Sequence, residues 1–553
     1  MGVIHMMYFK RSFVSLVAIL LVLTGAFLWT HGARSDDIYS AISKNLPVLG
    51  LIYKEVSANY VDQIDAERFL KAGIDGMLNT LDPYTVYFDR DDDHQIQVLT
   101  QGKYGGVGMP LNLRNNVVTV VEPPFLGTPA ARVGIREGDM VIKVDGEDTE
   151  KMGLDEAARR IRGPIGSEVT LTIRRQGEPE LLEFTLVREQ IKIDDVRYAG
   201  YIRDGIGYIR LTRFSKNAGP EVSEAIRQLN PQNLEGLILD LRSNPGGMLE
   251  AAVEISDLFL SKGVTIVSTK GRSEGSMREE KSRQIPIYGE GPLVVLVNRF
   301  SASASEIVAG AIQDHDRGLV LGDTTFGKGL VQSLIPLSQS AALKITTAKY
   351  YTPSGRCIQK RDYSSWSDSS STDNTLAYYT RLGRIVKGGG GIAPDINITS
   401  PQISDVAWDM RRKSLFFNFA VHYHTTNADL DSNIIINDTI MKEFRDYLKT
   451  KSFEYQHPIE SQLDELKTES LEAGYGTVLM DDIDHLKQAL ESAKETMLAS
   501  SEDEIKLFLR RELASKFYGL RREVEVGLED DPVVSRALEI LSDRQSYSSI
   551  LEK

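Results

Sequence analysis

Strand-like and helix-like hydrophobic patterns alternate along the middle of the chain, over residues 191–401. Short apolar runs such as residues 237–241 and 293–297 have the length of buried strands, and stretches with helical spacing, such as residues 249–260, lie between them. A short continuous apolar run is consistent with a strand buried on both faces. Because strand and helix patterns alternate here, we expect residues 191–401 to form an α/β core.

Residues 100–190 have a different pattern, with several short strands close together. Two residue pairs suited to tight hairpins, Asn115-Asn116 and Asp145-Gly146, separate neighbouring strands. Short helix-like stretches interrupt the series at residues 130–133 and 154–161. We therefore expect a compact β-rich domain, with strands at residues 108–113, 117–121, 140–144, 169–173 and 181–187.

Helical patterns flank these two domains on both sides. In residues 34–99 the apolar side chains fall near one helix face, and Asp65 precedes them as a helix cap. Residues 402–553 combine helical spacing with dense charge of both signs, which is typical of a solvated helical bundle. An oligomerisation or adaptor-binding domain is the alternative, and the sequence does not separate the two.

Residues 1–33 have the pattern of a targeting or anchoring segment. Lys10 and Arg11 precede a largely apolar run at residues 13–29, which is the arrangement of a signal peptide or a signal anchor. Residues 26–33 contain no clean small-residue cleavage motif, so an uncleaved anchor is favoured. We expect the basic residues to stay inside and the rest of the chain, anchored in the inner membrane, to face the periplasm of a bacterial envelope.

Composition and charge narrow the range of functions. The chain has 553 residues, room for about three or four domains, and its net charge of −14 argues against nucleic-acid binding. Cys357 is the single cysteine, so neither an intrachain disulfide nor a cysteine-rich metal site can form. His422 and His424 lack a clear third ligand and are interpreted as surface or packing residues. We therefore expect neither a metal nor a cofactor.

A serine-rich run at residues 301–306 connects a predicted strand to a predicted helix. The strand is residues 293–297 and the helix residues 307–312. A serine at such an elbow lies close to the N–H groups of a helix start, which carry partial positive charge and favour anions. This arrangement suits a nucleophile, and a serine N-cap without chemistry is the alternative.

Histidine, the usual base for such a serine, is poorly placed in this chain. His315 is the only histidine in residues 190–400 and follows Ser303 by twelve positions. If the helix continues that far, the histidine lies about 18 Å from the serine, which is out of reach. We therefore do not expect a Ser/His/Asp triad.

Lys328, which lies in a glycine-rich segment, is the candidate base. Its usual pKa of about 10.4 keeps a lysine charged at neutral pH, but burial can lower that pKa by about three to five units. Phe326, Leu330 and Val331 are available to form an apolar pocket, and Gln332 could hold the amine or the serine hydroxyl by its amide. A structural lysine in a glycine turn is the alternative.

The same glycine-rich segment, residues 322–329, nearly fits a phosphate-binding loop. Its last position is Gly329, so the hydroxyl that would bind magnesium is missing. The residues that follow alternate like a strand, whereas a phosphate-binding loop opens a helix. We therefore do not expect nucleotide binding.

A second strand-to-helix turn offers donors for an oxyanion, the charge that develops on an attacked carbonyl oxygen. Residues 237–248 have the pattern of a buried strand that ends in a Pro-Gly-Gly turn, and glycine lets the backbone approach a ligand closely. Gly246 or Gly247 would supply one N–H group and Ala304 the other. An ordinary strand–turn–helix connection is the alternative.

Five motifs in a fixed order give the chain a resemblance to a known family. They are residues 240–247 (DLRSNPGG), 298–306 (NRFSASASE), 322–329 (GDTTFGKG) with Gln332, 350–356 (YYTPSGR) and 391–395 (GIAPD). The chain resembles the carboxy-terminal processing peptidases, or tail-specific proteases, of the S41 serine peptidase family. The resemblance covers roughly residues 35–400. It implies an α+β multidomain protein with a crotonase- or ClpP-like α/β protease core and an inserted PDZ domain.

The family spacing assigns roles to individual residues. In this family the nucleophile precedes the glutamate by three positions and the lysine by twenty-five, which selects Ser303 here. Ser301 and Ser305 are then supporting loop residues. The resemblance further implies Lys328 as general base, Gln332 as the residue that orients it, and oxyanion donors near Gly247 and at Ala304.

Residues 100–190 resemble a PDZ domain through the glycine loop at residues 105–109, the segment 130–139 and the turn 161–163. N–H groups of such a loop can hold a chain-terminal carboxylate while the peptide adds a strand to the sheet edge. Arg162 would sense the bound end by its charge, and a surface arginine in a turn is the alternative. The expected substrate contacts in the loop are Gly106, Val107, Gly108 and Met109.

Together these inferences favour an envelope serine endopeptidase that binds apolar C-terminal tails of proteins and cuts inside the chain. Cleavage would use a Ser303/Lys328 dyad and an acyl-enzyme, and tail docking in the PDZ domain would also align the core. The rival interpretation is a membrane-tethered PDZ scaffold or holdase with a silent core. An acyl-transferring or acyl-CoA enzyme is a third alternative, which the PDZ-like insertion disfavours. A second copy of the chain and an adaptor protein are open as partners.

Overall fold

The computed structural model describes residues 39–89, 103–230, 232–338, 341–361, 363, 376–399, 403–427 and 429–552. The chain divides into two compact units, Met1–Tyr87 and Phe88–Lys553. The apolar segment at residues 13–29, predicted to be an anchor, lies outside the described residues. Of the helices within the described ranges, none combines the length and the apolar character that a membrane span needs.

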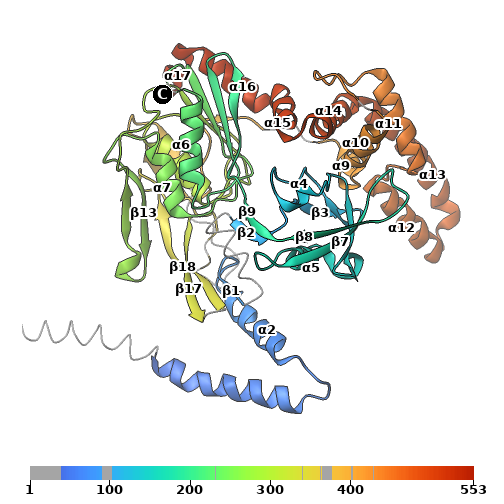
Figure 1. Ribbon diagram of the computed structural model, residues 1–553, viewed down its shortest axis with the longest axis horizontal. Coiled ribbons are helices and arrows are strands. Elements are labelled where there is room, and N and C mark those ends of the chain that lie inside the picture. Colours follow the sequence, from blue (N-terminus) through green and yellow to red (C-terminus); the bar gives the residue numbers. More distant parts are fainter. Residues whose placement is uncertain are drawn as a thin grey trace, which may run out of the picture. The chain divides into compact units, whose positions relative to one another are not determined.

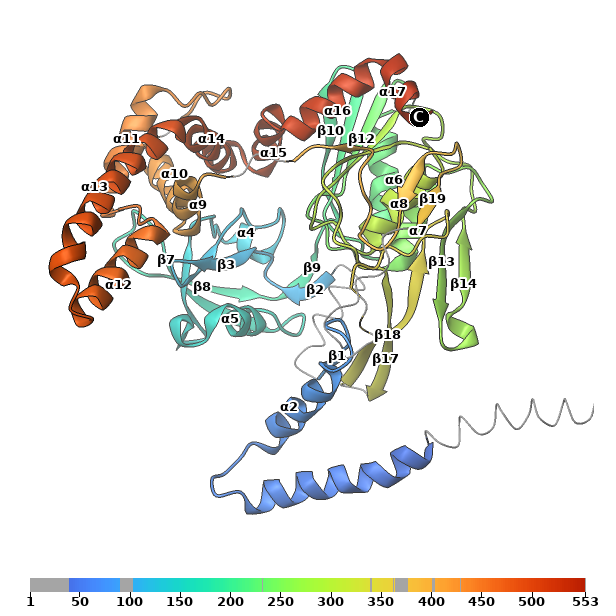
Figure 2. The same ribbon diagram turned by 180° about the vertical axis from the view of Figure 1, so that it is seen from behind.

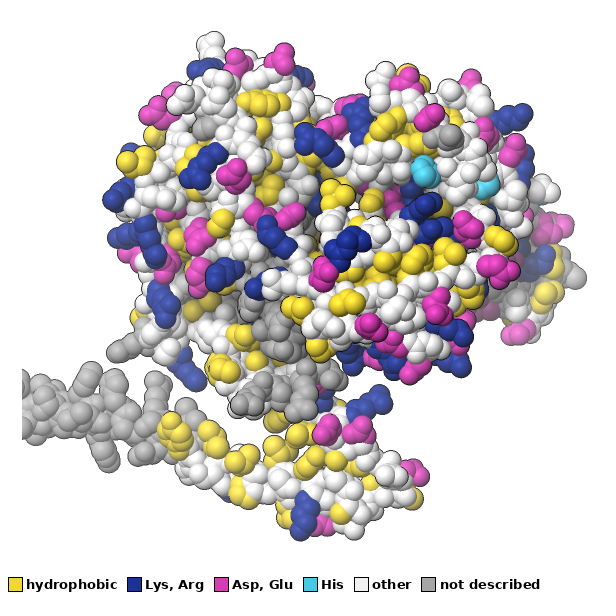
Figure 3. Space-filling view, viewed as in Figure 1, with side chains coloured by type: hydrophobic (Ala, Val, Ile, Leu, Met, Phe, Trp, Pro, Cys, Tyr) yellow, Lys and Arg dark blue, Asp and Glu magenta, His cyan; other side chains and the backbone are white. Residues whose placement is uncertain are grey.

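Two helices occupy most of the described part of the first unit. One runs through residues 39–59 and the other is α2 (Ala66–Leu78); the short strand β1 (Val86–Phe88) comes later in the chain. Asp65 caps α2 as predicted, because its carboxylate accepts the N–H groups two and three residues on, at 3.0 and 3.1 Å. Both helices leave apolar side chains exposed, which appear yellow in Figure 3.

A mainly parallel sheet forms the middle layer of the α/β core in the second unit (Figures 1 and 2). In spatial order its strands are β10 (Val196–Arg203), β11 (Ile206–Leu211), β12 (Gly236–Asp240), β15 (Leu293–Val297), β16 (Leu319–Gly322) and β21 (Ile396–Asn397). β10 and β11 are antiparallel, and each later pair is parallel. The predicted buried strands are confirmed as β12 and β15, whose residues are all buried because helices cover both faces.

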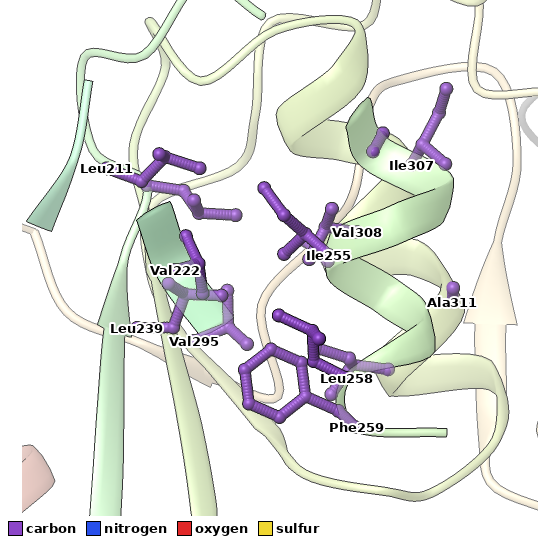
Figure 4. Packing of buried hydrophobic residues seen from close by; sticks show 14 of the residues in the cluster. Leu211, Val222, Leu239, Ile255, Leu258, Phe259, Val295, Ile307, Val308 and Ala311 are labelled. Atoms are coloured by element: carbon purple, nitrogen blue, oxygen red, sulfur yellow. The ribbon is translucent and has the colours of Figure 1, made fainter. Parts of the chain in front are cut away.

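One face of this sheet is covered by α6 (Ala218–Gln228), α7 (Leu249–Asp257) and α8 (Ala304–Asp314). Figure 4 shows the resulting core. Val222 of α6, Ile255 of α7 and Val308 of α8 belong to one buried cluster with Leu239 and Val295 of the sheet. The helix predicted after the serine-rich run is therefore confirmed as α8.

The opposite face is covered by helices from the far end of the sequence, α16 (Pro532–Ser542) and α17 (Arg544–Leu551). Val533 and Ile540 pack in one buried cluster with Ile238 and Val294 of the sheet. The hydroxyl of Tyr547 accepts from the backbone N–H of the first residue of β15 and donates to its carbonyl oxygen. The end of the region predicted to be a helical C-terminal domain thus contributes to the α/β core.

A separate sheet contains four antiparallel strands in the order β14 (Arg278–Lys281), β13 (Thr265–Gly271), β18 (Ala341–Tyr351) and β17 (Leu330–Ser338), and a fifth strand completes it. The 3-10 turn η3 (Glu274–Ser276) lies between β13 and β14. β17 begins two residues after Lys328, which confirms the strand predicted there and agrees with the exclusion of a phosphate-binding loop. The strands β19 (Ala377–Tyr379) and β20 (Ile385–Lys387) form a small hairpin.

The β-rich domain has the expected composition of strands and short helices. Its sheet contains β3 (Leu111–Arg114), β4 (Val117–Val120), β5 (Met140–Val144), β7 (Glu168–Arg174) and β8 (Leu182–Val187), with β6 (Glu147–Asp148) beside β5. The other elements are α4 (Pro129–Arg132), η2 (Thr149–Lys151), α5 (Gly153–Ile161), and the paired strands β2 (Lys103–Gly106) and β9 (Glu189–Lys192). Asn115 and Asn116 have φ angles of 50° and 62°, which confirms the predicted hairpin turn.

Residues 405–529 form a helical bundle with a hydrophobic core of its own. Its helices are α9 (Asp405–Arg412), α10 (Leu415–Thr426), α11 (Asp438–Thr450), α12 (Pro458–Glu472), α13 (Gly476–Ser500), α14 (Glu502–Tyr518) and α15 (Leu520–Glu529). The ring of Phe444 lies 5.5 Å from that of Phe416 and 5.1 Å from that of Phe419, measured between centroids. Aromatic contacts between α10 and α11 therefore contribute to the bundle core.

Candidate active site

Ser303 occupies a strained position at the elbow between β15 and α8. Its φ of 55° and ψ of −111° lie outside the regions that L-residues usually adopt. Ser303 is the N-cap of α8, but an ordinary N-cap residue has an extended backbone, so its conformation is not the one that capping alone requires. Its neighbours Ala302 and Ala304 are buried, whereas Ser303 is partly exposed. A sharp, strained strand-to-helix turn is how several hydrolases present a nucleophilic serine.

The carboxylate of Glu306 connects the elbow to the loop that carries Lys328. Glu306 is fully buried, and its Oε2 accepts the backbone N–H of Ser303 at 2.8 Å and that of Lys328 at 2.9 Å. Its Oε1 accepts the N–H of Gly327 at 2.7 Å and the hydroxyl of Thr325 at 2.6 Å. Burial raises the pKa of Glu306 above its usual value, although these four hydrogen bonds oppose the shift.

Because one carboxylate oxygen bonds both N–H groups, the backbones of Ser303 and Lys328 lie side by side. A further hydrogen bond connects the same segments, because Phe326 N–H donates to the carbonyl of Ser301 at 3.0 Å. The hydroxyl of Tyr350, on β18, donates to the carbonyl of Ser303 at 3.1 Å. Phe326 itself is 46% exposed, so it encloses the lysine less than the sequence suggested. The two residues predicted to form the dyad are thus brought together at the level of the backbone.

The Pro-Gly-Gly turn lies directly against Ser303. A Cβ at Gly246 would be 2.9 Å from the Ser303 Cβ and 2.9 Å from the Ala304 nitrogen, so only glycine fits there. The Gly246 N–H donates to Asn244 Oδ1 at 2.9 Å. Neither the N–H of Gly247 nor that of Ala304 donates to an acceptor among the residues that the structure describes. Of the two predicted glycines, Gly247 therefore has the N–H group available to a ligand.

The hydroxyl groups of Ser301 and Ser305, two positions on either side of Ser303, bond the backbone of neighbouring segments. The hydroxyl of Ser301 donates to the Leu241 carbonyl at 2.8 Å, and that of Ser305 to the Asn244 carbonyl at 2.9 Å. Both hydroxyls are buried. Both hydrogen bonds agree with supporting roles for these serines, although Ser305 lies in the first turn of α8 and not in the loop.

The remaining predicted residues of the core lie on β17 or at the far end of α8. Gln332 is on β17, where its side-chain nitrogen donates to Thr346 Oγ1 at 3.3 Å; its role toward the lysine stays a prediction. His315 forms the C-terminal end of α8, the end opposite Ser303, and its Nε2 lies 2.6 Å from the Thr265 carbonyl oxygen. This confirms that His315 is out of reach of the serine.

The two histidines of the bundle pack against aromatic rings, as interpreted from the sequence. His422 stacks on Tyr447 with a centroid distance of 5.5 Å, and His424 contacts the ring of Phe517 at 4.8 Å. In the part of the chain that the structure describes, no group of three or more His, Cys, Asp or Glu side chains is arranged to hold a metal ion.

The glycine loop of the β-rich domain presents backbone donors. The N–H groups of Val107, Gly108 and Met109 donate to no acceptor within the described ranges. Arg162 lies beside this loop, because its Cγ is 3.8 Å from the position that a Cβ on Gly106 would take. Its guanidinium lies 5.3 Å from the ring centroid of Tyr104. The structure thus brings the predicted contacts Gly106–Met109 and Arg162 together at one end of the domain.

Glu306 was not assigned a role from the sequence, where it served only to count back to the nucleophile. Its position three residues after Ser303 is the spacing of a capping box, and that signal was available. The sequence could not show that the same carboxylate also accepts N–H groups from a loop more than twenty residues later.

The comparisons with known protein families cover each region of the chain. The family described as peptidase family S41 matches residues 205–364, and the PDZ domain family matches residues 117–175. Residues 406–541 match a family described as the probable PDZ-protease C-terminal helical domain. Residues 31–92 match one described as the N-terminal domain of the activating protease CtpB.

Individual proteins are similar over longer stretches. A carboxy-terminal-processing protease of Bartonella bacilliformis is 41% identical over 320 residues, which cover 57% of this chain and 73% of the relative. A carboxyl-terminal-processing protease of Synechocystis sp. is 42% identical over 52% of this chain and 68% of the relative. The solved structure of a photosystem II D1 C-terminal processing protease is 26% identical, with a TM-score of 0.34 over 64% of this chain and 87% of that one.

Proposed function

Because the chain belongs to the carboxy-terminal processing proteases of peptidase family S41, we propose that Ser303 is the nucleophile and Lys328 the base of its serine peptidase chemistry. The observation that carries this assignment is the strained backbone of Ser303, held by a carboxylate that also binds the Lys328 backbone. Strain of this kind costs of order 1–3 kcal/mol and is concentrated at functional sites.

In the proposed reaction, the neutral amine of Lys328 takes the proton of the Ser303 hydroxyl as Oγ attacks the carbonyl carbon of the scissile peptide bond. The negative charge that forms on the carbonyl oxygen is stabilised by the free N–H groups of Gly247 and Ala304. The intermediate collapses to an acyl-enzyme, and the leaving amine takes the proton from the lysine. A water molecule, deprotonated by the same lysine, then attacks the ester carbonyl and releases the new C-terminus while Ser303 regains its proton. Gln332 is assigned to orient the lysine.

The PDZ domain of the chain indicates binding of peptide C-termini. We propose that the free N–H groups of Val107, Gly108 and Met109 bind the terminal carboxylate of a protein substrate with an apolar tail, and that the tail adds a strand to the sheet. The positive charge of Arg162 beside Gly106 supports the glycine loop as the carboxylate site. Tail docking is then also the signal that aligns the protease core.

We propose an envelope location with the N-terminal segment as an inner-membrane anchor, on the strength of the basic and apolar pattern before residue 30. For the helical segment at residues 402–553, we propose a second copy of the chain or an adaptor protein as the partner. Fractionation of cells that express the full chain tests the location: release into the soluble fraction without carbonate or detergent would contradict an anchor.

Substitution of Ser303 tests the proposed chemistry against a silent PDZ scaffold. With a test protein that ends in an apolar tail, Ser303→Ala should abolish cleavage, followed by mass spectrometry of the products, while tail binding measured by fluorescence anisotropy is unchanged. Ser273→Ala, at an exposed serine, is the matched control and should cleave normally. If the wild type is as inert as Ser303→Ala and both bind equally, the scaffold interpretation holds. Amidation of the tail carboxylate should weaken binding and slow cleavage, and equal rates for both tails would contradict gating.

A further inference from the structure

The C-terminal helices contact the turn that supplies the proposed oxyanion donor. Asp531 is the N-cap of α16: its Oδ1 accepts the N–H groups of Val533 at 2.9 Å and Val534 at 3.2 Å. Its other oxygen, Oδ2, accepts from Arg242 Nη1 at 2.7 Å. One carboxylate therefore both caps a helix that covers the sheet and binds an arginine in the Asp240–Gly247 segment, 289 positions away along the chain.

Arg242 is otherwise held by the residue at the end of β12. Asp240 accepts the backbone N–H of Arg242 at 2.8 Å, its Nε at 3.0 Å and its Nη2 at 2.6 Å, and it also accepts the hydroxyl of Tyr208 at 2.6 Å. Burial opposes ionisation of Asp240, but the charge and hydrogen bonds of Arg242 leave the pKa of Asp240 below its usual value. Although burial also opposes the charge of Arg242, the two aspartates hold its pKa well above the usual value.

The segment after Arg242 runs directly into the turn that faces Ser303. Ser243 has a positive φ of 58°, and its N–H donates to Asn298 Oδ1 at 2.9 Å. Asn244 then accepts the Ala302 N–H at 3.0 Å with its carbonyl oxygen. Residues Asp240 to Asn244 are thus held by bonds to neighbouring elements, and among the described residues Asp531 supplies the bond that comes from the C-terminal helices.

We propose that Asp531 is a positioning residue for the peptidase: it fixes the guanidinium of Arg242 and through it the turn that presents the Gly247 N–H. This inference rests on the proposed oxyanion hole. It makes α16 part of the catalytic architecture, in addition to its role as a cover of the sheet. A donor displaced by a fraction of an ångström binds the transition state less well without losing its contact with bound substrate.

Asp531→Asn separates positioning from helix capping. Asparagine is as good an N-cap as aspartate, so α16 should remain intact, whereas the ionic bond to Arg242 is lost. We expect kcat for the tailed test protein to fall about tenfold with KM nearly unchanged. The thermal midpoint should fall only modestly, because Asp240 still pairs with Arg242. The acidic limb of the pH profile should keep its position, because the base is not altered. Asp543→Asn is the matched control. Asp543 is the N-cap of α17 and also accepts two backbone N–H groups, so this variant should keep full activity.

Two outcomes would overturn the proposal. The first is an unchanged kcat in Asp531→Asn. The second is an equal loss in Asp543→Asn, which would mean that any weakened cap loosens the core. Failure of the proposed chemistry is a distinct result, because it appears as continued cleavage by Ser303→Ala whatever Asp531 does. Pre-steady-state measurement of acylation identifies the step that is slowed in Asp531→Asn. We expect slower acylation with normal substrate affinity.

Discussion

At the scale of single residues, the geometry of the site depends on the hydrogen bonds of one buried carboxylate, that of Glu306. Glu306 accepts four hydrogen bonds, one from Ser303 and three from the segment that carries Lys328, and all four donors are fixed in the backbone or in a buried hydroxyl. An acceptor-only side chain suits this position, because both of its oxygens face donors. The strained conformation of Ser303 persists because Glu306 and the Pro-Gly-Gly turn determine it from both sides.

Glu306→Gln should therefore damage both stability and catalysis. An amide presents NH₂ hydrogens where the carboxylate presents an oxygen, so on one side two buried donors lose their acceptor, at about 1–3 kcal/mol each. We expect a lower thermal midpoint and a loss of kcat/KM of about a hundredfold, measured by thermal unfolding and by cleavage of the tailed test protein. Glu250→Gln removes an exposed carboxylate from the first turn of α7 and should change neither. Normal cleavage by Glu306→Gln would contradict the role of this carboxylate.

At the scale of elements, the sequence predicted those strands and helix ends that are determined by residues close together in the chain. The apolar runs identified β12 and β15, and Asp65 identified the start of α2, because burial on both faces and capping leave local patterns. The candidate nucleophile and lysine came from motif spacing. The contacts between distant elements left no such pattern. The apolar positions of α16 do not reveal that they face Val294, and no residue near Arg242 indicates its bond to Asp531.

The turn before α7 offers a test at this scale. Gly246 and Gly263 both have a left-handed backbone, with φ of 94° and 90°, but a Cβ at Gly246 would lie 2.6 Å from the Ala302 carbonyl oxygen, whereas nothing lies within 4 Å at Gly263. Both alanine variants therefore share a backbone strain of about 1 kcal/mol, and only Gly246→Ala pushes the turn away from Ser303. We expect kcat to fall by about a hundredfold in Gly246→Ala and to stay normal in Gly263→Ala. Equal activity of the two variants in the cleavage assay would show that close approach at Gly246 is not required.

At the scale of the second unit, the PDZ domain and the helical bundle meet at a buried ion pair. Lys516 Nζ of α14 lies 3.0 Å from Glu137 Oε1, and the two side chains are 5% and 6% exposed. The ammonium also lies 4.4 Å from the ring centroid of Phe417 on α10. A buried pair of this kind adds little net stability but is costly to break on one side only. The strength of this contact between the PDZ domain and the bundle therefore depends on the protonation of the pair.

The pH dependence of this contact follows from the ionisation of Glu137. Burial raises the pKa of Glu137 to about 7, more than its attraction to Lys516 lowers it. The other charged groups that act on the pair are Glu512, Glu523 and Asp139. The folded protein thus keeps a proton on Glu137 that the unfolded chain has released, so this stabilisation is present at acid pH and is lost as pH rises through about 7. Burial lowers the pKa of Lys516, and that contribution changes with pH only above its lowered folded pKa.

We expect the free energy of local opening of α14 to fall by about 1–3 kcal/mol between pH 5 and pH 7.5, measured by hydrogen exchange corrected for intrinsic rates. Glu137→Gln should remove most of this slope, because the amide does not titrate. Glu150→Gln, at an exposed acid of the same domain, should retain it. A slope that persists in Glu137→Gln would assign the effect to another group.

The cover that α16 and α17 give the central sheet has a consequence for biosynthesis. Ile238, Val294 and Leu296 have no apolar cover on their side of the sheet until residues 532–551 have left the ribosome. A nascent chain in which Ser303 and Lys328 have already been synthesised still lacks the covering helices α16 and α17 and the contact between Asp531 and Arg242. A prematurely terminated product would therefore expose these apolar strands, which favours aggregation and degradation.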